Sequence, residues 1–120
     1  MTERQALVVD DILTNRLIAL TLLRKAGWLS DEADCGEIAL TMAAKQAYQL
    51  VLLDISMPGL SGEETCARLR ELYADRPLRI VAYTAHAFEE DRNRFLAAGF
   101  DDILVKPINR DRLLAALTGA

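Results

Sequence analysis

Short apolar runs alternate with longer amphipathic stretches along the chain. The runs have the length and continuous hydrophobicity of buried strands, except the second, whose weak alternation favours a short edge strand. They cover residues 7–9, 28–33, 50–53, 78–83 and 103–105. The stretches that follow them carry apolar residues at helical spacing, which predicts helices over residues 13–26, 38–47, 61–72, 88–98 and 112–117. Strict alternation of strand and helix predicts a parallel sheet with helices on both faces and right-handed crossovers.

Glycine, proline and one capping pair mark the ends of these elements. Gly27 and Gly99 each stop a helix. Residues 57–59, Met-Pro-Gly, form a loop, because proline and glycine together end the preceding strand. Ser61 and Glu64 have the spacing of a capping box and open the third helix.

Composition places the chain among single-domain soluble proteins. Its 120 residues suit one compact domain, residues 1–120, and 52% hydrophobic with 27% charged residues is ordinary for a globular fold. The net charge of -4 argues against non-specific nucleic-acid binding. Cys35 and Cys66 lack the spacing and histidine partners of a zinc site, so we expect structural thiols in a reducing cytoplasm. The longest apolar stretch, residues 17–23, is too short to cross a bilayer, and the polar first residues lack a signal peptide.

Charged residues follow three of the predicted strands. Asp10 and Asp11 come after the first strand, Asp54 after the third and Lys106 after the fifth, and Thr84 closes the fourth. The carboxyl ends of parallel strands meet at one sheet edge, where such folds bind ligands. Three carboxylates brought together repel by roughly 4 kcal/mol per pair at 4 Å with an effective dielectric near 20. Such a cluster must hold a cation or shift its pKa values upward, and Mg²⁺ matches its oxygen ligands.

This cluster suggests phosphoryl chemistry. A carboxylate beside a metal can attack phosphorus and form an acyl phosphate, and Asp54 is the natural nucleophile because it stands apart from the acidic pair. The cation and Lys106 would stabilise the charge on the transferring group. The alternative is that these residues form no site and are solvated loop carboxylates and a surface lysine.

With their neighbours, these residues resemble the receiver domain of two-component response regulators over essentially the whole chain. The matching segments are residues 8–11, residues 53–58 with Gly62, residues 83–85 and residues 106–107. The resemblance implies a flavodoxin-like (βα)5 fold, a three-layer α/β sandwich whose five-stranded parallel sheet has the order 2-1-3-4-5. Residues 10–16, 84–87 and 99–102 are closer still to receivers attached to hybrid histidine kinases, although a stand-alone regulator also fits the chain.

The resemblance also assigns roles to the metal and phosphoryl ligands. Asp54 would accept a phosphoryl group from a histidine kinase or a histidine phosphotransfer protein. Asp10, Asp11, Asp54 and the backbone carbonyl of Ser56 would hold Mg²⁺. As an isolated domain the protein would be no enzyme beyond this self-catalysed transfer and its own dephosphorylation.

Further implied roles concern the switch. Thr84 would hydrogen-bond the phosphoryl oxygen and Lys106 would form an ion pair with it. The Lys106–Pro107 peptide would be cis, which proline permits at about 0.5–1 kcal/mol. The output surface would comprise the fourth helix, fifth strand and fifth helix, including Phe88, Arg92, Ile103 and Arg112.

The chain departs from the family pattern at one position. Receivers commonly carry an aromatic residue three positions before the lysine, where this chain has Ile103, and we expect that side chain to pack in the core. Ser56 and His86 would flank the phosphoryl group and tune its lifetime, and His86, on a loop, is not expected to carry phosphohistidine. Trp28 is expected to be a packing residue.

Two other functions fit the sequence less well. A small Mg²⁺-dependent phosphatase that forms an aspartyl phosphate would need a second aspartate two residues after the nucleophile, where this chain has Ser56. A receiver-like interaction module that is never phosphorylated would not need all the site residues. Nucleotide-binding enzymes are disfavoured because the sequence lacks their glycine-rich motifs.

Overall fold

The protein is an α/β sandwich built on one parallel sheet. The computed structural model describes residues 4–55, 59–85, 89–106 and 108–118. The sheet has the strand order β2-β1-β3-β4-β5, so the expected flavodoxin-like fold and its 2-1-3-4-5 order are confirmed. The strands are β1 (Gln5–Val9), β2 (Leu29–Ala33), β3 (Leu50–Asp54), β4 (Arg79–Thr84) and β5 (Asp102–Val105). The helices are α1 (Leu13–Lys25), α2 (Gly36–Lys45), α3 (Gly62–Leu72), α4 (Glu89–Ala98) and α5 (Arg110–Thr118).

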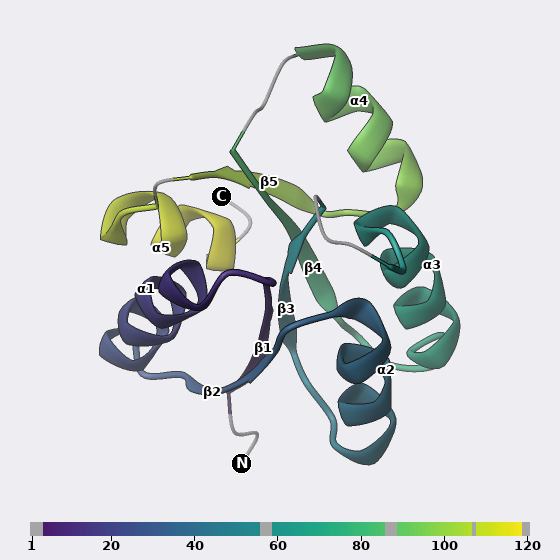
Figure 1. The fold of residues 1–120 in the computed structure, drawn as a ribbon, viewed down its shortest axis with the longest axis horizontal. Coiled ribbons are helices and arrows are strands. Elements are labelled where there is room, and N and C mark those ends of the chain that lie inside the picture. The colour runs from purple at the N-terminus through teal and green to yellow at the C-terminus, as the bar shows by residue number, and fades with distance from the viewer. Residues whose placement is uncertain (1–3, 56–58, 86–88, 107, 119–120) are drawn as a thin grey trace.

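The helices cover both faces of the sheet and divide the core in two. In Figure 1, α1 and α5 lie on one face, and α2, α3 and α4 lie on the other. Side chains alternate along each strand, so consecutive residues face different helices. The α2–α4 core contains Leu7, Val9, Val51, Leu53, Ile80, Ala82 and Ile103 from the strands, with Ala39, Cys66 and Phe95 from the helices. The α1–α5 core contains Ala6, Val8, Leu50, Leu52, Val81, Tyr83 and Leu104, with Leu23 and Leu113. Burial on both faces explains why the strands read as continuous apolar runs.

The strand register aligns the carboxyl ends of four strands. Val9 pairs with Leu53, and the next residue of β3, Asp54, pairs with Tyr83. Thr84, the last residue of β4, pairs with the last residue of β5. The residues that end these strands therefore lie side by side, as the sequence predicts.

Two helices begin earlier than predicted. Helix α2 covers Gly36–Lys45 rather than residues 38–47: it begins directly after the extended residue Cys35, where φ is -156°, and ends where the backbone leaves the helix at Gln46, where φ is -141°. Its first residue packs so closely on α3 that a Cβ at Gly36 would collide with Thr65 Oγ1. Helix α5 begins at Arg110 rather than residue 112, because the Asn109 side chain accepts a hydrogen bond from the backbone N–H of Arg112 at 2.9 Å and caps the helix.

The other boundaries lie within two residues of prediction; the largest difference is in β1, which begins at Gln5 rather than at residue 7. Strand β4 is displaced by one residue, and α3 starts directly after the expected cap. Ser61 Oγ accepts the backbone N–H of Glu64 at 3.1 Å, while the Glu64 carboxylate receives the Ser61 hydroxyl at 3.3 Å instead of a backbone N–H. The first residue of the predicted fourth helix, Phe88, lies outside the described residues. None of the helices in the described part of the chain has the length and apolarity needed to cross a membrane.

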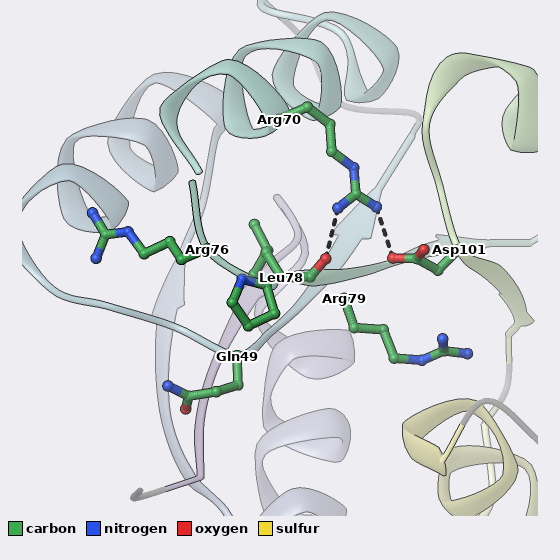
Figure 2. A pocket seen from close by; sticks show the side chains of 7 residues that line it. Gln49, Arg70, Arg76, Leu78, Arg79 and Asp101 are labelled. Carbon is green, nitrogen blue, oxygen red and sulfur yellow. Dashed lines mark hydrogen bonds and ion pairs between the residues drawn. The ribbon is translucent and has the colours of Figure 1, made fainter. Parts of the chain in front are cut away.

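A hollow of about 420 Å³ lies at the opposite, amino edge of the sheet (Figure 2). Arg70, on α3, is one of the residues that line it. Its guanidinium donates to the carbonyls of Leu78 at 2.6 Å and Gly99 at 2.7 Å, and forms an ion pair with Asp101 at 2.7 Å. Because this arginine is already paired, the hollow is a structural junction between α3, β4 and β5.

Candidate functional site

Three carboxylates meet at the carboxyl edge of the sheet. Asp10 directly follows β1, Asp54 ends β3, and one oxygen from each of Asp10, Asp11 and Asp54 lies within 4.8 Å of the others. Asp10 is 0% exposed and Asp54 is 2% exposed, whereas Asp11 is exposed. The interpretation as solvated loop carboxylates is therefore wrong for Asp10 and Asp54.

Asp10 is fixed by its surroundings. Its N–H donates to the carbonyl of Ala33 at 3.1 Å, and its Oδ1 accepts the N–H of Ile12 at 2.9 Å. Its Oδ2 is buried, and the ammonium of Lys106 lies 2.9 Å from it. Oxygens from Asp10, Asp11 and Asp54, all within 4.8 Å of one another, supply the hard oxygen donors that suit Mg²⁺. The residues present therefore fit such an ion.

Lys106 balances part of this negative charge. Its Nζ lies 2.9 Å from Asp10 Oδ2 and 3.5 Å from Asp54 Oδ2, and its side chain is only 14% exposed. Its backbone N–H donates to the carbonyl of Thr84 at 2.7 Å, which ties the residue after β5 to the end of β4. The lysine thus contacts both buried carboxylates, and lies closer to Asp10 than to Asp54.

The ring of Tyr83 packs against the ammonium of Lys106. The Lys106 ammonium lies 4.6 Å from the centre of the Tyr83 ring, within the range of a cation–π contact. Burial, with the negative charges of Asp10 and Asp54, raises the pKa of Tyr83 to about 12, so the ring stays neutral. Because Tyr83 belongs to the α1–α5 core, Lys106 approaches the carboxylates from that side of the sheet. Tyr83 lies in a segment that matches the receiver family, but the sequence alone assigns it no role. Its pairing with Asp54 in the sheet is the feature that could have pointed to it.

A second neighbour that the sequence does not single out is Arg16. It lies in the first turn of α1 and donates to the backbone carbonyl of Asp10 at 2.8 Å. Only the structure brings this side chain to the acidic pair.

Thr84 and Ile103 lie on the other face of the sheet by strand alternation. Thr84 is 3% exposed at the end of β4, and Ile103 belongs to the α2–α4 core, as its expected packing role requires. The burial of Ile103 contradicts one expectation, because this side chain is predicted to be part of the output surface and is not exposed. Arg92 and Arg112 are exposed on α4 and α5.

Several expected site residues cannot be placed. Ser56, His86 and Pro107 lie outside the described residues, so the Ser56 carbonyl ligand, the two lifetime positions and the cis peptide stay predictions. Trp28 is half-buried against the α1–α5 core, which confirms packing. Cys66 is buried, and this burial raises the pKa of its thiol to about 11.

Comparisons with known proteins agree with this geometry. The family model described as the response regulator receiver domain matches residues 6–118. The chain is 37% identical over 112 residues to the sensor histidine kinase GacS of Pseudomonas protegens; the match covers 91% of this chain and 12% of that protein. The chain thus spans about an eighth of this curated relative.

Solved structures are similar over almost the full chain. The chemotaxis protein CheY4 of Vibrio cholerae superposes with a TM-score of 0.88 at 28% identity, covering 98% of both chains. The receiver domain of the sensor histidine kinase PA1611 from Pseudomonas aeruginosa has a TM-score of 0.86 at 31% identity, with 98% of this chain and 96% of that one covered. That structure has a magnesium ion coordinated in its active-site cleft. Fold, acidic edge and sequence agree, and the chain belongs to the family of response regulator receiver domains.

Proposed function

We propose that this receiver domain is the phosphoacceptor of a two-component phosphorelay, with Asp54 as the residue that is phosphorylated. One observation carries the proposal. Two buried carboxylates, Asp10 and Asp54, share the ammonium of Lys106 and lie within 4.8 Å of the carboxylate of Asp11. Keeping such charges together out of water is unfavourable unless the site serves a charged ligand.

The proposed step is a transfer of one phosphoryl group. An oxygen of the Asp54 carboxylate attacks phosphorus, so a P–O bond forms while the P–N bond of a phosphohistidine breaks. The bonding electrons of that P–N bond stay with the imidazole, which leaves as neutral histidine because its other ring nitrogen already carries a proton. Asp54 needs no base, because its ionised carboxylate is already the nucleophile.

Asp10, Asp11 and Asp54, with the backbone carbonyl of Ser56, would hold Mg²⁺. The ion would neutralise charge on the phosphoryl oxygens and lower the barrier to attack by an anion. The chain's own contribution is the placement of the carboxylates: β1 and β3 are neighbours in the sheet, and hydrogen bonds from the backbone fix Asp10.

Lys106 and Thr84 would detect the phosphorylated state. Lys106 already lies 3.5 Å from Asp54 Oδ2, so its ammonium can pair with a phosphoryl oxygen after little movement. Thr84 would donate a hydrogen bond to the same group, and Ser56 and His86 would tune how long it survives. The change would reach a partner through the surface of α4, β5 and α5, where Arg92 and Arg112 are exposed.

The proposal extends to the setting of the domain. Residues 1–120 would form one receiver domain in the cytoplasm, and its phosphodonor would be a histidine kinase or a histidine phosphotransfer protein. The similarity to part of a sensor histidine kinase supports this kind of donor.

Phosphorylation by a small phosphodonor tests the proposal. The protein is incubated with acetyl phosphate and Mg²⁺, and the adduct is followed by intact mass. We expect one phosphoryl group on the wild type and on the control Asp34→Asn, which removes an exposed carboxylate just after β2, but none on Asp54→Asn or after chelation.

The outcomes separate the alternatives. An adduct that persists in Asp54→Asn would place the phosphoryl group elsewhere. No adduct with any donor would favour the interaction module that works without phosphorylation. Release of many phosphates without an accumulating adduct would favour the phosphatase.

A further inference from the structure

Arg16 joins three elements next to the acidic pair. Its Nη1 donates to the backbone carbonyl of Asp10 at 2.8 Å, and its Nε forms an ion pair with Glu32 Oε1, on β2, at 2.7 Å. The Arg16 side chain is only 14% exposed, although Glu32 is 43% exposed. A guanidinium held at two of its nitrogens has little freedom to turn, because its planar fork fixes both contacts together.

The position of Arg16 in the helix is unfavourable by itself. It lies in the first turn of α1, where the helix dipole favours anions, and that turn contains no acidic residue. Without stabilising contacts, an arginine would be more favourable near the carboxyl end of the helix. The contacts with Glu32 and with the Asp10 carbonyl offset this position.

The Asp10 carbonyl belongs to the peptide that leads into Asp11. The N–H and Oδ1 of Asp10 are held by Ala33 and Ile12, and its carbonyl is held by Arg16. The orientation of this peptide plane sets the direction in which the exposed Asp11 side chain leaves the backbone. Asp11 itself is the least buried of the three carboxylates and so depends most on its backbone for placement.

We propose that Arg16, oriented by Glu32, is a positioning residue that sets the Asp10–Asp11 peptide for divalent-cation binding. This inference rests on the proposed function, since it assigns Asp11 to the cation. Arg16 touches neither the cation nor the phosphoryl group, and acts through the Asp10 carbonyl.

The charge of Arg16 and its proposed positioning role predict opposite effects of Arg16→Gln on Mg²⁺ affinity. Arg16 is a cation beside an acidic cluster, so by charge alone Arg16→Gln should tighten Mg²⁺ binding. Removing both charges in Arg16→Gln/Glu32→Gln leaves the net charge unchanged, so by charge alone the double variant should bind like the wild type. If Arg16 positions the peptide, both variants bind more weakly.

Mg²⁺ titrations by calorimetry on the full chain measure this difference. The set is wild type, Arg16→Gln, the double variant and the control Arg24→Gln, which removes an exposed arginine from the last turn of the same helix. We expect the dissociation constant to rise about tenfold in Arg16→Gln and in the double variant, as when a residue supporting a metal ligand is lost. Arg24→Gln should stay at the wild-type value. Urea unfolding of each variant verifies that it is folded.

A metal-free readout accompanies the titration. The carbonyl ¹³C resonance of Asp10 and the amide ¹⁵N resonance of Asp11 should shift in both Arg16 variants and remain in place in Arg24→Gln. Unchanged or tighter Mg²⁺ binding in Arg16→Gln, or wild-type binding in the double variant, would overturn the positioning role. If the wild type binds no Mg²⁺, the proposed function fails, and unshifted Asp10 and Asp11 resonances would then refute the peptide contact independently.

Discussion

Gly62 is a position at which a single added methyl group should disturb Asp54, the proposed phosphoacceptor. It is the first residue of α3, and a Cβ there would lie 2.6 Å from Ile55 Cα and 2.9 Å from the carbonyl oxygen of Asp54. Ordinary contact begins at 3.4 Å, so relieving the closer clash requires a shift of 0.8 Å (3.4 − 2.6). Both neighbours are backbone atoms and cannot rotate away. Gly62→Ala must therefore move either the start of α3 or the Asp54–Ile55 peptide.

The magnitude follows from two opposing effects. Overpacking costs about 1–3 kcal/mol, and a clash with backbone belongs at the upper end. Replacing glycine by alanine in a helix returns about 1 kcal/mol. We expect a net loss of about 2 kcal/mol in the free energy of unfolding. Because a displacement near 1 Å at a reacting group can slow a reaction about a hundredfold, phosphorylation of Asp54 should slow by at least about tenfold.

Urea unfolding and the rate of phosphorylation by acetyl phosphate measure the two effects. Gly27→Ala is the control, since Gly27 has φ +89° and a Cβ added there would meet nothing within 4 Å, at the far end of α1 from the acidic edge. A side chain in that backbone conformation costs about 1–2 kcal/mol, so this variant loses stability but keeps its phosphorylation rate. If Gly62→Ala is as stable as the wild type, or is phosphorylated as fast as Gly27→Ala, the packing argument is refuted.

Three further substitutions test other contacts. Lys106→Met leaves Asp10 and Asp54 without their cation and should lower metal-free stability by about 3 kcal/mol, with Mg²⁺ restoring part of it; an equal loss in urea unfolding with and without Mg²⁺ would contradict this. Burial raises the pKa of Cys66 from 9.0 to about 11, so the native thiol keeps its proton where the unfolded chain releases it. The Cys66 contribution to stability should be full below pH 9 and fall by up to about 2.7 kcal/mol as the pH rises to 11. Cys66→Ala should therefore make the slope of urea-unfolding stability with pH shallower, most clearly between about pH 9 and 10, below the ordinary range of tyrosine titration. Ser61→Ala removes the acceptor of the Glu64 N–H and should cost about 1 kcal/mol by thermal unfolding, whereas Ser61→Thr should retain most of it.

The sequence predicts the order and type of every element, because strands buried on both faces and amphipathic helices have different periods. The helix starts at Gly36 and Arg110 were missed for local reasons. Gly36 follows Cys35, whose extended backbone carries no side-chain cap that a sequence search could find, and Arg110 follows an asparagine cap that a search for apolar periodicity overlooks.

The acidic edge was predictable for a simple reason. Each of its charged residues follows an apolar run, and parallel strands bring their carboxyl ends together. The order of contacts within the edge was not predictable, since Lys106 lies closer to Asp10 than to Asp54. The contacts of Tyr83 with Lys106 and of Arg16 with Asp10 depend on strand register and on the side of the sheet that α1 covers, which spacing in one sequence does not reveal.

Because the core is divided into two clusters, the packing beneath α4 and the packing on the side of Lys106 can change separately in evolution. Leu23 lies in the α1–α5 core, the side from which Lys106 reaches the carboxylates, and Leu69 lies in the α2–α4 core with Ile103. Substitutions that share no packing partners combine additively. Under the proposed function, packing beneath α4 can therefore change while the packing beneath Tyr83 and Lys106 stays the same, so one acidic edge would serve different outputs.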